Sequence, residues 1–230
     1  MSIAENIAQV RTNIAQACAQ AGRSPEEITL VGASKMNDAA ACREAIAAGI
    51  DALGENRVQE MTAKLADNAY DGAPLHFIGH LQRNKVKQVV GKVALIQSVG
   101  SMELLEEIEK VAAREQLVQE ILLEVNIGRE EAKSGFDPDA VTAAAEAALS
   151  LPHVRVRGLM TIPPADADRD ANMRYFQEVQ ALYVDINTKL FHNELKYLSM
   201  GMSGDYEDAI RAGATMVRVG TAIFGARHYH

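Results

Sequence analysis

The sequence has very few cysteines and no long hydrophobic run, and each shortage excludes a class of protein. Cys18 and Cys42 are the only cysteines among 230 residues, and both fall among alanines in helical patterns. We therefore expect two buried thiols rather than a disulfide or a metal site. No stretch approaches the roughly 20 apolar residues of a membrane span, and no apolar segment follows a basic one near the amino terminus. We expect a cytoplasmic protein that does not enter a membrane.

Positive charge is also scarce. The 23 lysines and arginines are outnumbered by 31 aspartates and glutamates, which gives a formal net charge of -8. Such a chain is not built to attract nucleic acid or an anionic membrane. The histidines lack the paired spacing of metal ligands, so we expect no metal site, and the last two suit an unstructured tail. The histidines are His76, His80, His153, His192, His228 and His230.

Short apolar runs recur along the chain, and a helical pattern precedes the first of them. The opening segment, Ser2 to Ala21, carries apolar residues at three- and four-residue steps and ends at Gly22, which predicts an amphipathic helix. Eight apolar runs follow, each typical of a strand. The predicted strands are Ile28 to Ser34, Ala52 to Gly54, Leu75 to Gly79, Leu95 to Val99, Glu120 to Ile127, Val154 to Thr161, Tyr197 to Met202 and Met216 to Gly220.

Helical patterns separate these runs, which indicates parallel strands joined by crossover helices. Eight such units predict an α/β fold, a closed (β/α)8 TIM barrel with an extra N-terminal helix, in a single domain over residues 1–230. An open doubly wound sheet uses the same alternation, but no Gly-x-Gly-x-x-Gly fingerprint follows the first strand. The predicted helices are Asp38 to Ala48, Val58 to Ala66, Asn84 to Val90, Met102 to Glu115, Pro138 to Leu149, Asp170 to Leu190 and Tyr206 to Ala212.

Barrel closure would bring the first and last strands together. Lys35 follows the first strand, and Gly220 and Thr221 follow the last, where glycine lets an anion approach the backbone. A lysine next to a phosphate-sized pocket is what pyridoxal phosphate requires, because its aldehyde needs an amine and its phosphate needs N–H donors. An isolated lysine after a strand is more often only solvated, so the other features must support this interpretation of Lys35.

Three other polar residues have two interpretations each. Ser203 could contact the phosphate, or cap the helix that begins near Asp205. Arg218 could face the pyridine nitrogen of the cofactor, or pair with a core carboxylate such as Glu124. Asn56 could present its amide to a ring substituent, or cap the following helix.

Together the motifs resemble the pyridoxal phosphate homeostasis protein family, single-domain relatives of the alanine racemase barrel. They run through nearly the whole chain and are specific as a set. They are Ser34-Lys35, Gly54 to Glu60, His76 to Gly79 with Leu81-Gln82 and Asn84-Lys85, Leu123 to Asn126 with Lys133 to Phe136, Gly158 to Met160, Ser199 to Ser203, and Arg218 to Thr221.

The resemblance implies a fold-type III barrel in which Lys35 forms a Schiff base with pyridoxal 5'-phosphate, a form of vitamin B6. Ser203, Gly220 and Thr221 would hold the phosphate, and Asn56, Met200 and Arg218 would surround the ring. Family members often follow the Ser-Lys pair with a basic residue or proline, whereas this chain reads Met36-Asn37-Asp38. That departure leaves the Schiff base intact but removes a second lysine from a transfer role.

Two functions from different classes are consistent with these residues. The first is a carrier that buffers pyridoxal phosphate and supplies apo enzymes that use it, without catalysis of its own. The second is an amino-acid racemase, which needs an acid or base on each face of the substrate Cα. The racemase family takes its second base from an added domain, which we expect this chain to lack, although Tyr206 or His80 could replace it. We expect a monomeric carrier; an interaction module without cofactor would leave the lysine, glycine and serine placement unexplained.

Overall fold

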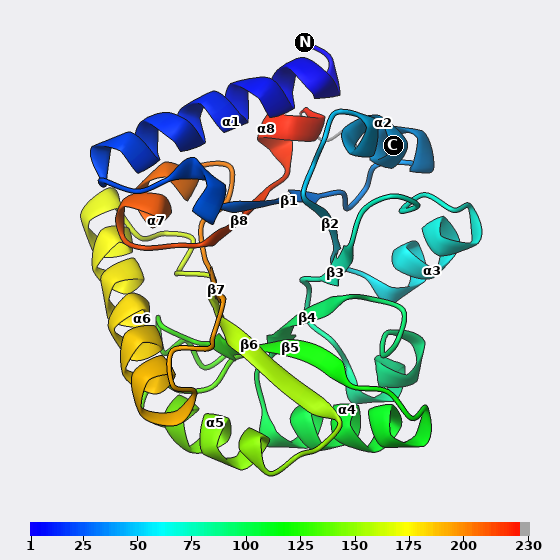
Figure 1. The fold of residues 1–230 in the computed structure, drawn as a ribbon, viewed down its shortest axis with the longest axis vertical. Coiled ribbons are helices and arrows are strands. Elements are labelled where there is room, and N and C mark those ends of the chain that lie inside the picture. Colours follow the sequence, from blue (N-terminus) through cyan, green and yellow to red (C-terminus); the bar gives the residue numbers. More distant parts are fainter. Residues whose placement is uncertain (226–230) are drawn as a thin grey trace.

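Parallel strands close into a barrel in the computed structural model, which describes residues 1–225 (Figure 1). Each strand pairs with the next along the chain, and β8 pairs with β1 to complete the ring. The predicted TIM barrel is confirmed. His228 and His230 lie outside the described residues. The strands are β1 (Thr29–Ala33), β2 (Ala52–Glu55), β3 (Leu75–Phe77), β4 (Leu95–Val99), β5 (Gln119–Val125), β6 (Val154–Thr161), β7 (Tyr197–Ser199) and β8 (Met216–Val219).

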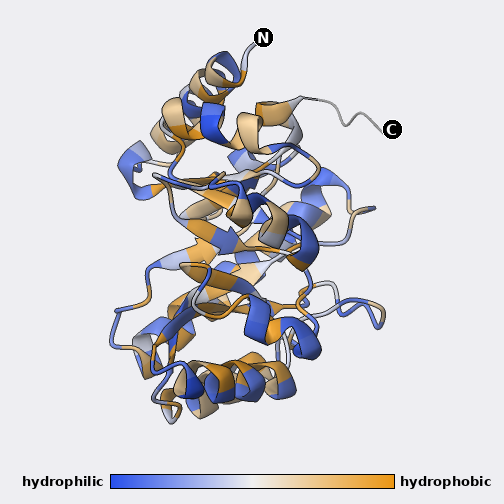
Figure 2. Cartoon of the chain, turned by 90° about the vertical axis from the view of Figure 1, so that its right-hand side faces the viewer, coloured by the Kyte–Doolittle hydropathy of each residue, from blue (hydrophilic) through white to orange (hydrophobic). Residues whose placement is uncertain are grey.

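Helices surround the barrel, as Figure 1 shows, and their apolar sides cover the outward faces of the strands. Figure 2 shows the hydrophobic residues concentrated in the strands and on the helix faces that meet them. The α-helices are α1 (Ile3–Gln20), α2 (Ala39–Ala47), α3 (Val58–Ala66), α4 (Met102–Arg114), α5 (Val141–Leu149), α6 (Arg169–Leu190), α7 (Tyr206–Arg211) and α8 (Thr221–Phe224); the 3-10 helices are η1 (Pro25–Glu27) and η2 (Arg83–Gln88).

The extra N-terminal helix, α1, is present as predicted. Ser2 and Glu5 form a capping box at its start, which satisfies N–H groups that the first turn leaves without partners. Its buried stripe includes Ile7, Val10 and Ile14, and the helix packs against α7 and α8 beside the junction of β8 and β1 (Figure 1). The helix therefore covers the side of the barrel where the ring closes.

Two predicted helices differ from the structure. The segment predicted as a helix at 84–90 is a 3-10 helix, η2, because its hydrogen bonds join residues three apart, as from Val89 N to Val86 O. The helix predicted from Pro138 begins only at Val141, since the N–H of Ala140 bonds back to Asp137 in a turn. Neither difference alters the strand order.

The barrel interior has an apolar part and a polar part. One cluster of buried residues, separate from the outer core, fills the interior and consists of Val31, Ala52, Leu95, Leu122, Met160 and Met216. Since alternate residues of a strand share a face, Arg218 lies on the same inward face as Met216, two residues closer to the carboxyl end. This position puts the only buried arginine of the described residues below the mouth of the barrel.

Both cysteines are reduced and buried, as the sequence predicts, and burial raises the pKa of each thiol. No helix in residues 1–225 combines the length and the apolar character needed to cross a bilayer. Within the same residues, no group of three or more histidine, cysteine or acidic side chains is placed to hold a metal ion.

Candidate functional site

The first component of the site is Lys35, which lies in a tight turn just beyond the carboxyl end of β1. The residue is half-buried, and the turn continues through Met36, whose φ of 63° lies in the left-handed region. Asp38 then caps α2 by accepting a hydrogen bond from Ala41 N at 2.8 Å. A strand end on one side and a capped helix on the other thus hold the lysine at the mouth of the barrel.

A buried ion pair fixes the backbone immediately before Lys35. The ammonium of Lys64, on α3, donates to the carbonyl oxygen of Ser34 at 2.8 Å and to Glu55 Oε1 at 2.6 Å. The hydroxyl of Ser34 donates to the same carboxylate oxygen, also at 2.6 Å. Glu55 is fully buried, so its charge depends on Lys64 for compensation.

A second carboxylate fixes the backbone after Lys35. Glu60 Oε1 accepts a hydrogen bond from Met36 N and another from Lys64 Nζ at 2.9 Å. Burial acts to lower the pKa of Lys64, but the hydrogen bonds and charges of Glu55 and Glu60 outweigh it and raise that pKa. Lys64 is therefore a permanent cation that ties both sides of the Lys35 turn to α3.

The second component lies where β7 and β8 end. Ser203 Oγ accepts hydrogen bonds from the main-chain N–H groups of Gly220 at 3.1 Å and Ala222 at 3.4 Å. The alternative in which Ser203 caps the next helix is wrong, because α7 begins at Tyr206 after Asp205 and Ser203 faces α8 instead. Thr221 is exposed at the start of α8.

The two components are neighbours because β1 pairs with β8 in parallel. The register aligns Gly32 with Val219, so that Ala33 lies beside Gly220. A Cβ built on Gly220 would lie 3.4 Å from the carbonyl oxygen of Ala33, which shows how near the two strand ends are. Lys35, Gly220 and Thr221 are thus gathered at one edge of the barrel, as barrel closure predicts.

Arg218 is fully buried between these components and the barrel interior. Its Nη1 donates to Ser199 Oγ at 2.6 Å and its Nη2 donates to the carbonyl oxygen of Thr161 at 2.9 Å. Burial lowers the pKa of the guanidinium to about 10, which leaves it a cation at neutral pH. The predicted alternative of an ion pair with Glu124 is wrong, because no such pair is formed among the described residues.

Glu124 is nevertheless the carboxylate whose charge does most to raise the pKa of Arg218 against the effect of burial. Burial raises the pKa of Glu124, while a 3.2 Å hydrogen bond from Ser134 Oγ and the charge of Arg218 oppose that rise. A buried acid and a buried base therefore share the mouth of the barrel without direct contact.

Asn56 and Met200 differ in what they can offer a ligand. Asn56 does not cap α3, because the N-cap position is Arg57 and no side chain caps the helix. The buried Oδ1 of Asn56 has no hydrogen-bond partner in residues 1–225. That orphaned acceptor is a reason to expect a donor from a ligand. The side chain of Met200 has no exposed surface and packs in the outer hydrophobic core.

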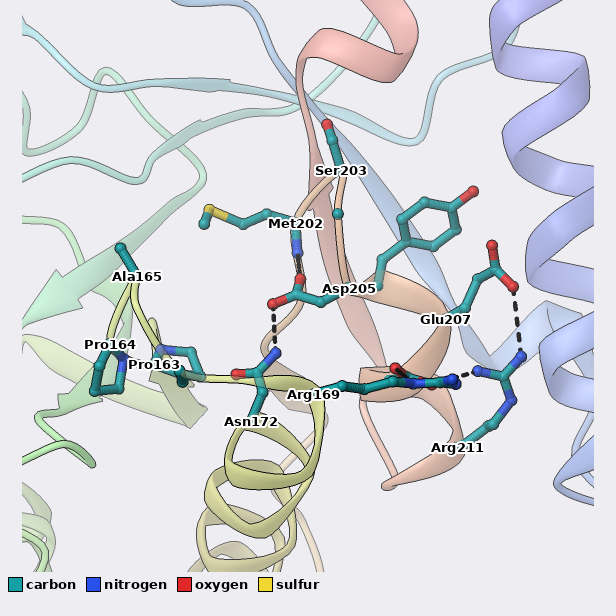
Figure 3. Close-up of a pocket in the computed structure, with 14 residues that line it drawn as sticks. Pro163, Pro164, Ala165, Arg169, Asn172, Met202, Ser203, Asp205, Glu207 and Arg211 are labelled. Carbon is teal, nitrogen blue, oxygen red and sulfur yellow. Dashed lines mark hydrogen bonds and ion pairs between the residues drawn. The ribbon is translucent and has the colours of Figure 1, made fainter.

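A cavity of about 660 Å³ opens beside Ser203, between the start of α6 and α7 (Figure 3). Asp205 holds one wall together by accepting from Met202 N at 2.6 Å and from Asn172 Nδ2 at 2.9 Å. The cavity is lined by Ser203 but not by Lys35 or Arg218, so it meets the candidate site only at Ser203.

The two residues considered as a second catalytic base are placed differently. Tyr206 is buried, and its hydroxyl accepts a 2.9 Å hydrogen bond from Asn13 of α1, outside the barrel. Burial raises the pKa of that hydroxyl, so it stays protonated at neutral pH and is not available to accept a proton as a phenolate. His80 is exposed.

Several residues around the site are not identified by sequence reasoning. Glu55 and Lys64 lie nine residues apart on different elements, so no local pattern joins them. Gln97 does leave a trace, since it is a polar residue inside an apolar strand. Such an interruption in a buried strand predicts a polar contact in the interior, although not its partner.

Comparison with known proteins gives consistent matches over the whole chain. Residues 6–228 match the model of the alanine racemase N-terminal domain family. The chain is 42% identical over 229 residues to the pyridoxal phosphate homeostasis protein of Aquifex aeolicus, covering 100% of both. It is 39% identical over 230 residues to the protein of the same name from Escherichia coli K12, covering 99% of this chain and 97% of that one.

Solved structures agree with these matches. PipY of Synechococcus elongatus, with pyridoxal phosphate bound, has a TM-score of 0.85 at 33% identity over 97% of this chain and 100% of that one. An alanine racemase of Clostridium difficile has a TM-score of 0.73 at 18% identity, over 99% of this chain and 57% of that one. The second likeness is one of fold alone.

Proposed function

Because the chain belongs to the pyridoxal phosphate homeostasis protein family, within the alanine racemase N-terminal domain family, we propose that it binds pyridoxal 5'-phosphate and buffers its supply in the cell. The bound PipY structure supports the choice of ligand, since that protein shares the fold and a third of its sequence. The pairing of β1 with β8 carries the proposal, because it joins an amine to a cluster of N–H and hydroxyl groups.

In this proposal each part of the ligand has its own residues. Lys35 would hold the aldehyde carbon covalently, and Ser203, Gly220 and Thr221 would bind the phosphate. Asn56, Met200 and Arg218 would border the ring, with Met200 contributing its main chain. When bound, the cofactor supplies an electrophilic carbonyl group and a dianionic phosphate, which need a nucleophile and donors respectively.

The residues present fit such a ligand. Asn56 Oδ1 is buried without a partner, and the described residues take up two of the five N–H donors of Arg218. The main-chain N–H groups of Gly220 and Ala222 already converge on one oxygen, that of Ser203. The orphaned oxygen of Asn56 and the remaining donors of Arg218 support a small polar ligand there.

We propose a carrier rather than a racemase. Racemisation needs an acid or base group on each face of the substrate Cα. The hydroxyl of Tyr206 instead accepts a hydrogen bond from Asn13 on α1, outside the barrel. A carrier needs the lysine and the phosphate site alone. In the same proposal the protein is a monomer, residues 1–230 act as one domain in the cytoplasm, and apo enzymes that use the cofactor are its recipients.

An absorption spectrum of the purified protein tests the proposal. Wild-type protein mixed with pyridoxal 5'-phosphate should develop a visible band that survives gel filtration, while Lys35→Ala should lose it. Lys87→Ala, which changes an exposed lysine on η2, is the matched control and should keep the band. A wild-type protein without the band would refute ligand binding at Lys35.

A second measurement separates the carrier from the enzyme. The loaded protein is incubated with single amino acids in deuterated water, and exchange of the Cα proton is followed by NMR. We expect exchange no faster than with free pyridoxal 5'-phosphate. Rapid exchange at substrate-like concentrations would favour the racemase.

A further inference from the structure

A line of hydrogen-bonded side chains crosses the barrel interior from Arg218 to the opposite end. Arg218 Nη1 donates to Ser199 Oγ at 2.6 Å, and Ser199 Oγ donates to Gln97 Oε1, also at 2.6 Å. Gln97 Nε2 then lies 3.0 Å from His76 Nδ1. These four residues come from β8, β7, β4 and β3, and all are buried.

The donors in this line all point the same way. Gln97 Nε2 lies 3.2 Å from Met216 Sδ, which can only accept a hydrogen bond, so the amide nitrogen is on the side of Met216 and His76. Its oxygen is then left to accept from Ser199, whose oxygen in turn accepts from Arg218. The direction requires a neutral His76 with its proton on Nε2, and burial lowers the pKa of His76 to about 4.

The interior around this line is otherwise apolar. Val31, Leu95 and Met160 belong to the same inward-facing layer. Hydrophobic residues at the three polar positions would fill the interior without the free-energy cost of burying polar groups. A fully hydrogen-bonded line of polar groups instead specifies one arrangement of its members. The member at the mouth is Arg218, whose second hydrogen bond goes to the Thr161 carbonyl.

We propose that Ser199, Gln97 and His76 are positioning residues that hold the Arg218 guanidinium in the orientation from which it meets the ring of pyridoxal 5'-phosphate. The inference rests on the proposed function, because it is that function which gives Arg218 a ligand. In this proposal the orientation of the guanidinium is set by residues of β7, β4 and β3 in the barrel interior, and not by the neighbouring carboxylate Glu124.

The line ends at a second cavity, of about 630 Å³, at the amino end of the barrel. His76 lines this cavity together with Arg11, Glu26 and Asp51, and Arg11 pairs with Asp51 at 2.9 Å. The Nε2 side of the His76 ring therefore faces a cavity with polar walls, which is consistent with a proton on Nε2 and none on Nδ1. The cavity thus supports the donor direction that the proposal needs.

The first test uses the protein without cofactor. In ¹⁵N-histidine-labelled apo protein, the His76 signals should show an unprotonated Nδ1 and a protonated Nε2 at neutral pH. Gln97→Leu removes the donor to Nδ1 and should shift that signal, whereas Ser98→Ala should not. Ser98 is a matched control, because it is the buried neighbour of Gln97 in β4 and its hydroxyl has no partner in residues 1–225. A proton on Nδ1 in the wild type would overturn the proposal.

The second test measures the ligand. Ser199→Ala and Gln97→Leu should each weaken binding of pyridoxal 5'-phosphate by about threefold to tenfold and shift the visible band of the bound cofactor, because Arg218 loses its fixed orientation. Ser199→Thr keeps a hydroxyl and should restore both properties. Circular dichroism establishes that each variant is folded.

The outcomes separate this inference from the proposed function. If the wild type binds the cofactor and Ser199→Ala and Gln97→Leu behave like Ser98→Ala, the positioning line is wrong and the carrier function stands. If the wild type binds no cofactor, the proposed function is wrong, and the proposal about Arg218 falls with it, whatever the tautomer of His76. Should Gln97→Leu not fold, Ser199→Ala against Ser199→Thr decides the question.

Discussion

The ammonium of Lys64 donates a 2.8 Å hydrogen bond to the carbonyl oxygen of Ser34, the residue before Lys35. The same ammonium binds Glu55 and Glu60, and Glu60 also accepts from the N–H of Met36. The residues on both sides of Lys35 are therefore tied to one buried cation. This arrangement links the stability of the fold to the position of the lysine.

Replacing Lys64 by methionine should destabilise the protein by about 3 kcal/mol, because it leaves the buried charge of Glu55 without compensation. Urea unfolding followed by circular dichroism measures the change in the free energy of unfolding. Lys110→Met is the control, since Lys110 is exposed and pairs with Glu107 only on the surface of α4. Adding Glu55→Gln to Lys64→Met should recover part of the loss; no recovery would argue against an electrostatic cause.

Replacing Ser203 by alanine should weaken pyridoxal 5'-phosphate binding about tenfold, because the hydroxyl that gathers the N–H groups of Gly220 and Ala222 is lost. Titration followed by absorbance measures the affinity. Pyridoxal, which lacks the phosphate, should bind the variant and the wild type equally. Ser150→Ala, at the exposed end of α5, should change neither affinity. An equal loss for pyridoxal would place the effect away from the phosphate.

His76 should make the protein sensitive to acid. Burial lowers its pKa from 6.5 to about 4 in the folded protein, so between these values the unfolded chain binds a proton that the folded protein does not. The free energy of unfolding should therefore fall as the pH drops through this window, by up to about 3 kcal/mol from this residue. His76→Gln should flatten the dependence, measured as urea midpoints across the pH series. The exposed His192→Gln is the control, and equal slopes for wild type and His76→Gln would contradict the prediction.

Gly158 should not tolerate a side chain. A Cβ at this position would lie 1.7 Å from the carbonyl oxygen of Tyr197 on the paired strand β7, so the two strands would have to separate. Gly158→Ala should cost about 3 kcal/mol or more in the free energy of unfolding, or prevent folding. Gly204→Ala, where nothing lies within 4 Å, should leave thermal stability unchanged. Similar melting temperatures for the two variants would disprove the argument.

Much of the fold could be predicted because the chain is regular. Leu95–Val99 and Val154–Thr161 form strands with the predicted bounds. Other strands are shorter than their apolar runs, as β3 shows by ending at Phe77 when the run continues to Gly79. The extra residues leave the sheet at the mouth of the barrel, where the chain turns toward the following helix.

The candidate site could be predicted in part, for a related reason. Lys35, Gly220 and Thr221 follow strands, and the parallel topology alone brings strand ends together. The supporting contacts could not be predicted, because Lys64 and Gln97 act through the three-dimensional packing of helix on strand and strand on strand. The alternative of Ser203 as a helix cap is wrong because its hydroxyl accepts instead from the N–H of Gly220, which follows β8 and is far away in the sequence.

The pairing of β1 with β8 also sets an order of events during synthesis. Lys35 and the Gly220-Thr221 segment lie far apart in the sequence, so a nascent chain on the ribosome has no complete candidate site until β8 has docked against β1. A ligand that needs both halves then binds only the finished ring and stabilises it against opening. Occupancy of such a site would report that β8 has docked against β1.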